Sequence, residues 1–233
     1  PAVHYSMGGL WVDYDQMTEI PGLFAAGECD YSQHGANRLG ANSLLSAIYG
    51  GMVAGPNAVK YIKGLKKHAE DLPETIFEAR VKEETEKWEA ILKMDGTENA
   101  YLLHKELGEW MTDNMTVVRH NDRLEKTYEK LTELQERWNN INVNDTQRWS
   151  NQGAHFVRQL KNMLYLAKVM TKGALLRNES RGAHYKPEFP DRDDENFLKT
   201  TMAKFDPATG EPIITYQEVD VSLIPPRKRD YSA

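Results

Sequence analysis

HGANRLGANSLLSAIYGG, residues 34–51, combines a glycine-rich loop with the beginning of a helix. The small residues before Asn42 let the backbone approach another group closely. From Leu44 onward apolar residues recur every three or four positions, which indicates one buried helical face. Asn42 or Ser43 is the predicted N-cap, because its side-chain oxygen can accept a hydrogen bond from a free backbone N–H. The stretch therefore predicts a loop that leads into the N-terminus of a helix.

Arg38 lies in the middle of this loop. Its guanidinium can bind a carboxylate or a phosphate with two parallel hydrogen bonds. The helix that follows adds free N–H groups and a partial positive charge, so the stretch suits an anion or an electron-rich ring. The alternative is that Arg38 forms a surface ion pair and that the glycines only turn the chain. The residues alone leave both interpretations open.

The residues before the loop are predicted to be extended. Residues 3–13 with the polar turn 13–16 indicate a hairpin, and residues 20–26 indicate a short buried strand. Glu28 follows that strand and a glycine, where an acidic residue can bind a ribose or ribityl hydroxyl; a loop or capping role is equally compatible. His4 and His34 are single histidines, for which a structural role is the more frequent one.

The rest of the chain is predicted to be mainly helical. Pro56 either kinks the helix that begins near Asn42 or starts a second segment running to about Lys67. Four helices follow, which we expect to pack antiparallel around one apolar seam. They span residues 73 to about 94, 97 (with Thr97 as cap) to about 111, about 119–140 and about 151–178.

The C-terminal residues change in composition. Residues 181–194 are typical of a loop, and residues 202–206 and 213–221 flank the turn 206–210 as a predicted hairpin. The tail from Pro225 is predicted to be extended. The predicted class is α+β, with three parts: residues 1–68, a helical bundle over 73–178, and a loop and β-hairpin region over 179–233.

Composition excludes several classes of function. The 233 residues carry a formal net charge of -6, which argues against nucleic-acid binding and against general attraction to anionic lipid. Cys29 is the single cysteine, so no internal disulfide and no Cys/His metal site are expected, and an inert role in a reducing compartment fits it. No segment has the roughly 20 apolar residues of a spanning helix or the features of a signal peptide. GxGxxG and GxSxG motifs are absent.

The motifs together resemble a known family. PGLFAAGE (21–28) followed by HGANRLGANSLL (34–45), then SRGAH (180–184) and FPDRDDENFLK (189–199), resemble the flavoprotein subunit of succinate dehydrogenase and fumarate reductase. The resemblance covers essentially the whole chain. GECDYSQH (27–34) and SAIYGG (46–51) are most similar to the menaquinone-linked succinate dehydrogenase branch, which pairs with a dihaem cytochrome b anchor.

The resemblance implies a role for five residues. It implies that residues 1–68 are the C-terminal part of an FAD-binding α/β domain. Arg38 and His4 would bind carboxylates of the dicarboxylate substrate, and Glu28 would contact the ribityl or adenosine side of FAD. Ser43 and Leu44 would lie by the pyrimidine edge of the flavin. No catalytic residue and no metal ligand is expected in these residues.

The resemblance also implies an activity and partners. The family oxidises succinate to fumarate by hydride transfer to FAD and passes electrons to an iron-sulfur subunit and quinone. It is peripheral on the cytoplasmic side of the membrane, held through partner subunits that include the cytochrome b anchor. The chain has no initiating methionine and lacks the family's dinucleotide-binding strand, its FAD-linked histidine and its capping-domain arginine, the proton acceptor. We therefore expect a fragment that alone neither holds FAD firmly nor turns over succinate.

Other functions stay open at this point. Fumarate reductase runs the same chemistry in the opposite direction, and L-aspartate oxidase is a more distant relative with similar NSLL and SRG segments. A further alternative is an interaction module whose bundle and C-terminal region bind the iron-sulfur subunit without catalysis. An unrelated helical scaffold does not account for the ordered motifs.

Overall fold

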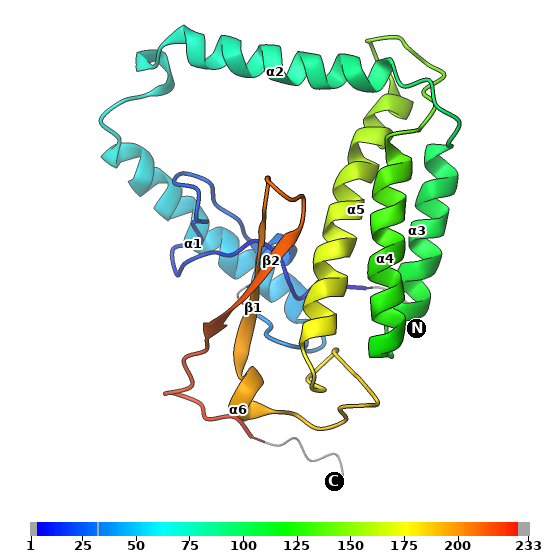
Figure 1. Cartoon of the computed structure of the whole chain (residues 1–233). Coiled ribbons are helices and arrows are strands. Elements are labelled where there is room, and N and C mark those ends of the chain that lie inside the picture. Colours follow the sequence, from blue (N-terminus) through cyan, green and yellow to red (C-terminus); the bar gives the residue numbers. More distant parts are fainter. Residues whose placement is uncertain (1–3, 32, 228–233) are drawn as a thin grey trace.

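Residues 34–51 form the predicted loop and helix. The computed structural model describes residues 4–31 and 33–227 (Figure 1). Helix α1 spans Asn42–Gly64, and the chain enters it from Ala41 at a left-handed φ of 64°. No side chain caps α1, so the predicted cap at Asn42 or Ser43 is wrong. The backbone closes the turn instead, because the Asn42 N–H donates to the Leu39 carbonyl at 3.2 Å.

Helix α1 continues through Pro56 to Gly64. Proline has no N–H to donate within the helix. One turn is reinforced by a side chain, because Asn57 Nδ2 donates to the Val53 carbonyl at 3.1 Å. The predicted alternative in which Pro56 begins a separate segment is therefore wrong.

The predicted strands before the loop do not form in the described residues 4–31. This segment has only isolated pairs, one between Leu10 and Asp30 and one between Met17 and Phe24, and the short 3-10 helix η1 at Gly27–Cys29. A strand needs a partner that continues beside it, and each of these pairings ends after one residue pair. The predicted hairpin and buried strand are therefore wrong.

Three helices make an up-and-down bundle: α3 (Ala100–Met115), α4 (Asn121–Trp138) and α5 (Gln152–Leu176). Leu103, Leu131 and Leu160 lie fully buried at its centre. The first of the four predicted helices forms as α2 (Glu74–Leu92), which meets one end of the bundle with its C-terminal end and extends away from it (Figure 1). Only Ile91 and Leu92 of α2 are buried, because the preceding turns are dominated by exposed Glu and Lys. The predicted antiparallel seam therefore holds for three helices and is wrong for α2.

The C-terminal hairpin is confirmed. The short 3-10 helix η2 (Ala69–Asp71) precedes α2, and the short helix α6 (Asp194–Phe197) precedes the hairpin. Strand β1 (Lys199–Phe205) pairs antiparallel with β2 (Pro212–Glu218), and both contact α5. The hairpin also binds the N-terminal part, because Trp11 Nε1 donates to Gln217 Oε1 at 3.0 Å and Lys204 pairs with Glu19 at 3.3 Å. It thus lies between that part and the bundle (Figure 1).

Across the described residues, none of the helices is both long enough and apolar enough to cross a membrane.

Candidate functional site

Arg38 is half-buried in the loop before α1. Its guanidinium carbon lies 4.8 Å from the centroid of the Tyr5 ring, and Nη1 donates to the Leu39 carbonyl at 3.0 Å. Among the described residues, no acceptor reaches its Nε, although that atom is buried. A buried N–H on a charged group costs free energy unless it is hydrogen-bonded. Arg38 therefore has hydrogen-bonding capacity that the described residues leave unused.

Tyr5 is itself held by a chain of hydrogen bonds. Its hydroxyl lies 3.2 Å from His34 Nε2 and 3.3 Å from Ser46 Oγ, and His34 Nε2 lies 3.1 Å from the same Ser46 oxygen. Ser46 in turn donates to the Ser43 carbonyl at 2.8 Å. These contacts fix the Tyr5 ring beneath the Arg38 guanidinium, where a cation is attracted to the ring face. His34 thus makes structural hydrogen bonds, as is more frequent for a single histidine, whereas no pattern in the sequence singled out Tyr5.

The other predicted site residues surround this cluster. His4 is exposed and directly precedes Tyr5 in the chain. Glu28 is exposed in η1, and its Oε1 accepts the Ser6 N–H at 2.9 Å, which ties the His4 segment to η1. Ser43 and Leu44 lie in the first turn of α1. Three segments that are separate in sequence thus meet at one place: residues 4–6, η1 and the loop with the helix start.

The exposed surface of α1 is apolar. Residues Leu44, Leu45, Ile48, Tyr49 and Met52 are each more than half exposed, and Leu44 is 73 % exposed. A contiguous apolar face of this kind marks a contact surface. The helix start has no side-chain cap, so its N–H groups and partial positive charge are available to a ligand.

The backbone at Gly27 packs closely against α1. Gly27 has a φ of +79°, and a Cβ added there would lie 3.3 Å from the Ala47 side chain. A glycine is needed at this position for both conformation and space. An uncapped helix start, an apolar face and a close glycine turn fit the edge of an aromatic cofactor such as a flavin.

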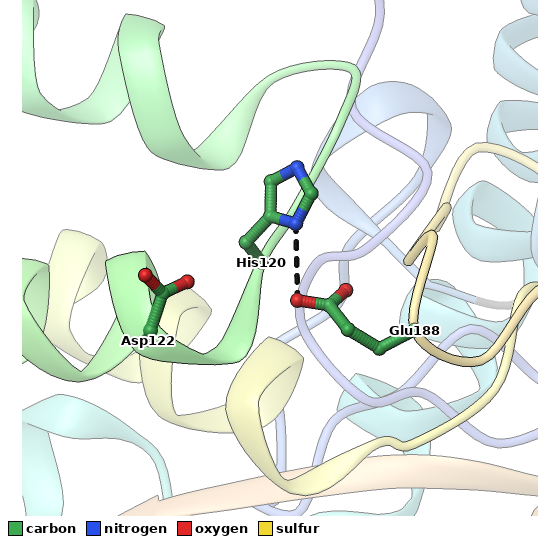
Figure 2. Close-up of side chains that lie close together, drawn as sticks. All are labelled: His120, Asp122 and Glu188. Carbon is green, nitrogen blue, oxygen red and sulfur yellow. Dashed lines mark hydrogen bonds and ion pairs between the residues drawn. The ribbon is translucent and has the colours of Figure 1, made fainter.

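A second polar cluster joins His120, Asp122 and Glu188 (Figure 2). Their potential ligand atoms lie within 4.8 Å of one another, and His120 Nδ1 is 3.0 Å from Glu188 Oε1. Backbone hydrogen bonds from Glu188 itself and from Asn121, together with His120, hold the pKa of Glu188 below its usual range. Asn121 begins α4, and a helix N-terminus favours carboxylates and disfavours cations. We therefore interpret this cluster as a cap of α4 by a distant loop.

The SRGAH motif contacts the loop that carries Arg38. The Ala183 N–H donates to the Ala36 carbonyl at 3.0 Å, although the two residues are far apart in the sequence. The sequence motifs that suggested a family therefore meet in space.

Comparisons with known proteins agree with this arrangement. The family described as fumarate reductase flavoprotein C-term matches residues 104–231, which is more than half of the chain. The chain belongs to the succinate dehydrogenase and fumarate reductase flavoprotein family. Residues 1–44 of this flavoprotein chain also match an FAD binding domain family. The resemblance seen in the sequence is thereby confirmed.

The relatives of this flavoprotein chain are considerably longer. It is 72% identical over 232 residues to the succinate dehydrogenase flavoprotein subunit of Bacillus subtilis, covering 100% of this chain and 40% of the relative. It is 36% identical over 234 residues to the fumarate reductase flavoprotein subunit of Haemophilus influenzae, covering 100% of this chain and 38% of the relative. A solved mutant of E. coli quinol fumarate reductase matches 97% of this chain and 38% of its own, at 36% identity and a TM-score of 0.90. The chain spans about two fifths of these relatives' lengths.

Proposed function

We propose that this chain is the C-terminal part of the flavoprotein subunit of a succinate dehydrogenase, which oxidises succinate to fumarate with FAD as the electron acceptor. The observation that carries the proposal is the half-buried Arg38, whose Nε has no acceptor among the described residues. A planar guanidinium matches a carboxylate in a way that an ammonium does not. The 72% identity to a succinate dehydrogenase flavoprotein subunit supports the direction of the reaction.

In this proposal two side chains hold the substrate. Arg38 binds one carboxylate through its fork, and its aromatic support at Tyr5 limits the directions in which it can point. His4 precedes Tyr5 and contributes a second carboxylate contact. A fixed dicarboxylate presents its central carbons in one orientation, which lowers the entropic cost of reaction. No described residue of the chain is assigned as the proton acceptor.

The chain also provides one side of the cofactor site. FAD, when bound, accepts a hydride from the dicarboxylate. The uncapped N-terminus of α1 at Ser43 and Leu44 would face a bound flavin, where its partial positive charge would stabilise negative charge on the ring. Glu28 contacts the ribityl or adenosine side, and its bond to Ser6 holds it near the His4 segment. We expect the chain alone to retain FAD poorly, because these residues cover one side of the cofactor only.

The proposal includes partners and a location. The longer flavoprotein would pass electrons to an iron-sulfur subunit and then to quinone. It would lie on the cytoplasmic side of the membrane and attach through its partner subunits, including a cytochrome b anchor. The exposed apolar residues of α1 and α2 support burial of these helices in a larger assembly.

Substituting Arg38 tests the proposal in the longer flavoprotein that contains this chain. Arg38→Lys keeps the charge but loses the fork, so we expect dicarboxylate affinity to fall about 10- to 100-fold with FAD content unchanged. Affinity is measured by the perturbation of the flavin spectrum, and activity by succinate-dependent dye reduction. Arg158→Lys, on the exposed face of α5, is the matched control. Unchanged dicarboxylate affinity in Arg38→Lys would show that Arg38 is assigned wrongly.

A further inference from the structure

The loop that carries Arg38 has few backbone hydrogen bonds of its own. Among the backbone hydrogen bonds described for residues 34–41, two close local turns: Asn37 to His34 and Asn42 to Leu39. The remaining one reaches a distant part of the chain, from the Ala183 N–H to the Ala36 carbonyl at 3.0 Å. Ala36 lies two residues before Arg38. The position of the loop backbone next to Arg38 thus depends on the turn that contains Ala183.

That turn approaches the loop as closely as a backbone can. Gly182 has a φ of +59°, and a Cβ added to it would lie 2.3 Å from the Ala36 carbonyl oxygen and 2.8 Å from the Ala36 Cβ. Atoms in real proteins do not come this close without displacement. The obstacle is backbone rather than a flexible side-chain end, so a side chain at position 182 must displace the loop.

A buried ion network around Glu179 holds the turn that contains Gly182 and Ala183. Glu179 has no exposed surface and accepts hydrogen bonds from Arg181 Nε at 2.8 Å and from the Asp193 N–H at 2.9 Å. Arg181 also binds Asp194 Oδ1 at 2.7 Å, and Arg177 binds Glu179 from the end of α5. Removing one partner of a buried pair leaves an uncompensated charge, so such a network resists rearrangement.

The backbone of the turn is closed as well. Arg181 and His184 exchange two backbone hydrogen bonds, at 2.8 and 3.0 Å. The His184 ring is bound on both sides, by Arg119 at 2.6 Å and by the Arg177 carbonyl at 2.9 Å. Side-chain and backbone hydrogen bonds thus hold the turn from several sides, and the Arg38 loop rests on it.

We infer that the turn 179–184 sets the position of Arg38 for dicarboxylate binding, with Gly182 as a positioning residue that touches neither substrate nor cofactor. The inference rests on the proposed function of Arg38. It assigns a recognition role to a segment that lies more than 140 residues away in the chain. Rigid support for a binding side chain matters because small displacements of a charged fork cost much of its affinity.

The test uses the longer flavoprotein with FAD bound. Gly182→Ala should raise the dissociation constant for a dicarboxylate at least tenfold, measured by flavin spectral perturbation, while FAD stays stoichiometric. Gly210→Ala is the matched control, because Gly210 also has a positive φ of +72° but no atom within 4 Å of an added Cβ. The control has a comparable positive φ without the clash, so it should leave the dissociation constant unchanged.

A milder variant covers the case in which Gly182→Ala does not fold. Arg181→Lys keeps the charge but cannot bind Glu179 and Asp194 with one planar group, so we expect a threefold to tenfold weaker dicarboxylate affinity with FAD retained. An unchanged dissociation constant in the folded variants, or a loss of FAD in parallel with affinity, would overturn the inference. If Arg38→Lys weakens binding and Gly182→Ala does not, only the inference fails. If Arg38→Lys itself has no effect, the proposed function of Arg38 fails.

Discussion

His184 is held in its neutral form by two neighbours that use different ring nitrogens. Arg119 can only donate, so Nδ1 accepts its hydrogen bond and Nε2–H donates to the Arg177 carbonyl. Burial is the main cause that lowers the pKa of His184 to about 4, and the charges of Arg119, Lys186 and Arg177 act in the same direction. The hydrogen bond to the Arg177 carbonyl opposes the shift without cancelling it. The network behind the turn thus depends on an uncharged imidazole.

The lowered pKa of His184 predicts that the stability of the folded chain depends on pH. The unfolded chain binds a proton at His184 below about pH 6.5, whereas the folded chain does so only near pH 4. The free energy of unfolding should therefore fall as pH drops from about 6.5 to 4, by at most about 1.4 kcal/mol per pH unit. His184→Gln removes this contribution and should flatten the profile, measured by urea unfolding at several pH values. His155→Gln, at an exposed site on α5, should leave the slope unchanged; an equal effect of both would contradict the prediction.

At the scale of elements, helix starts follow tertiary pairing as well as local sequence. Thr97 was the predicted cap of the helix that forms as α3, but that prediction is wrong, because the cap is Asn99. Asp95 and Glu98 form isolated pairings with Asn142 and Ile141, and a Cβ on Gly96 would lie 2.0 Å from the Asn140 carbonyl oxygen. The helix begins only where this pairing ends.

Two alanine substitutions test whether Asn99 or Thr97 caps α3. The Asn99 side chain accepts from the Tyr101 and Leu102 N–H groups at 2.9 and 3.2 Å, so Asn99→Ala should lower the free energy of unfolding by about 1 kcal/mol. Thr97 accepts one exposed hydrogen bond from Asn140 Nδ2, so Thr97→Ala should cost less than about 0.5 kcal/mol. Chemical denaturation of both variants checks the order. A larger loss for Thr97→Ala would favour the sequence-based cap.

At the scale of the whole molecule, buried apolar residues concentrate in the bundle. The cluster around Leu103, Leu131 and Leu160 is fully buried, whereas the apolar face of α1 is exposed. The bundle accordingly supplies most of the hydrophobic stabilisation of this chain, since that term scales with the apolar area removed from water. The division into residues 1–68, 73–178 and 179–233 agrees with this contrast but stays a prediction.

The difference in burial between the bundle and α1 predicts that Leu→Ala substitutions in the two places change the free energy of unfolding by different amounts. Leu160→Ala should lower the free energy of unfolding of the chain by about 2–5 kcal/mol, because it leaves a cavity in a packed core. Leu44→Ala, at a residue 73 % exposed, should change it by about 0.5 kcal/mol or less when no cofactor is bound. Urea unfolding of the two variants gives the comparison. Similar losses would mean that α1 is as tightly packed as the bundle.

The candidate site could be proposed from the sequence, but the residues that support Arg38 could not. Arg38 and the helix start could be singled out because an arginine lies among glycines directly before a periodic apolar run. The sequence does not predict the role of Tyr5, because that role is to support the Arg38 guanidinium and no local sequence pattern predicts this contact. Gly182 belongs to the SRGAH motif, but the spacing of residues in the sequence does not predict that it lies against Ala36. The roles of His4, Arg38, Glu28, Ser43 and Leu44 toward ligands stay predictions.

The amino-acid sequence by itself determined the five long helices, the C-terminal hairpin and the family, because periodicity, turn residues and ordered motifs are local properties. Only the tertiary structure decided that α2 leaves the bundle, that residues 4–31 form single pairings in place of strands, and that the turn 179–184 supports the Arg38 loop. These features depend on contacts between residues far apart in the chain. Such contacts form only where the surfaces of separate elements match, and local propensity carries no information about that match.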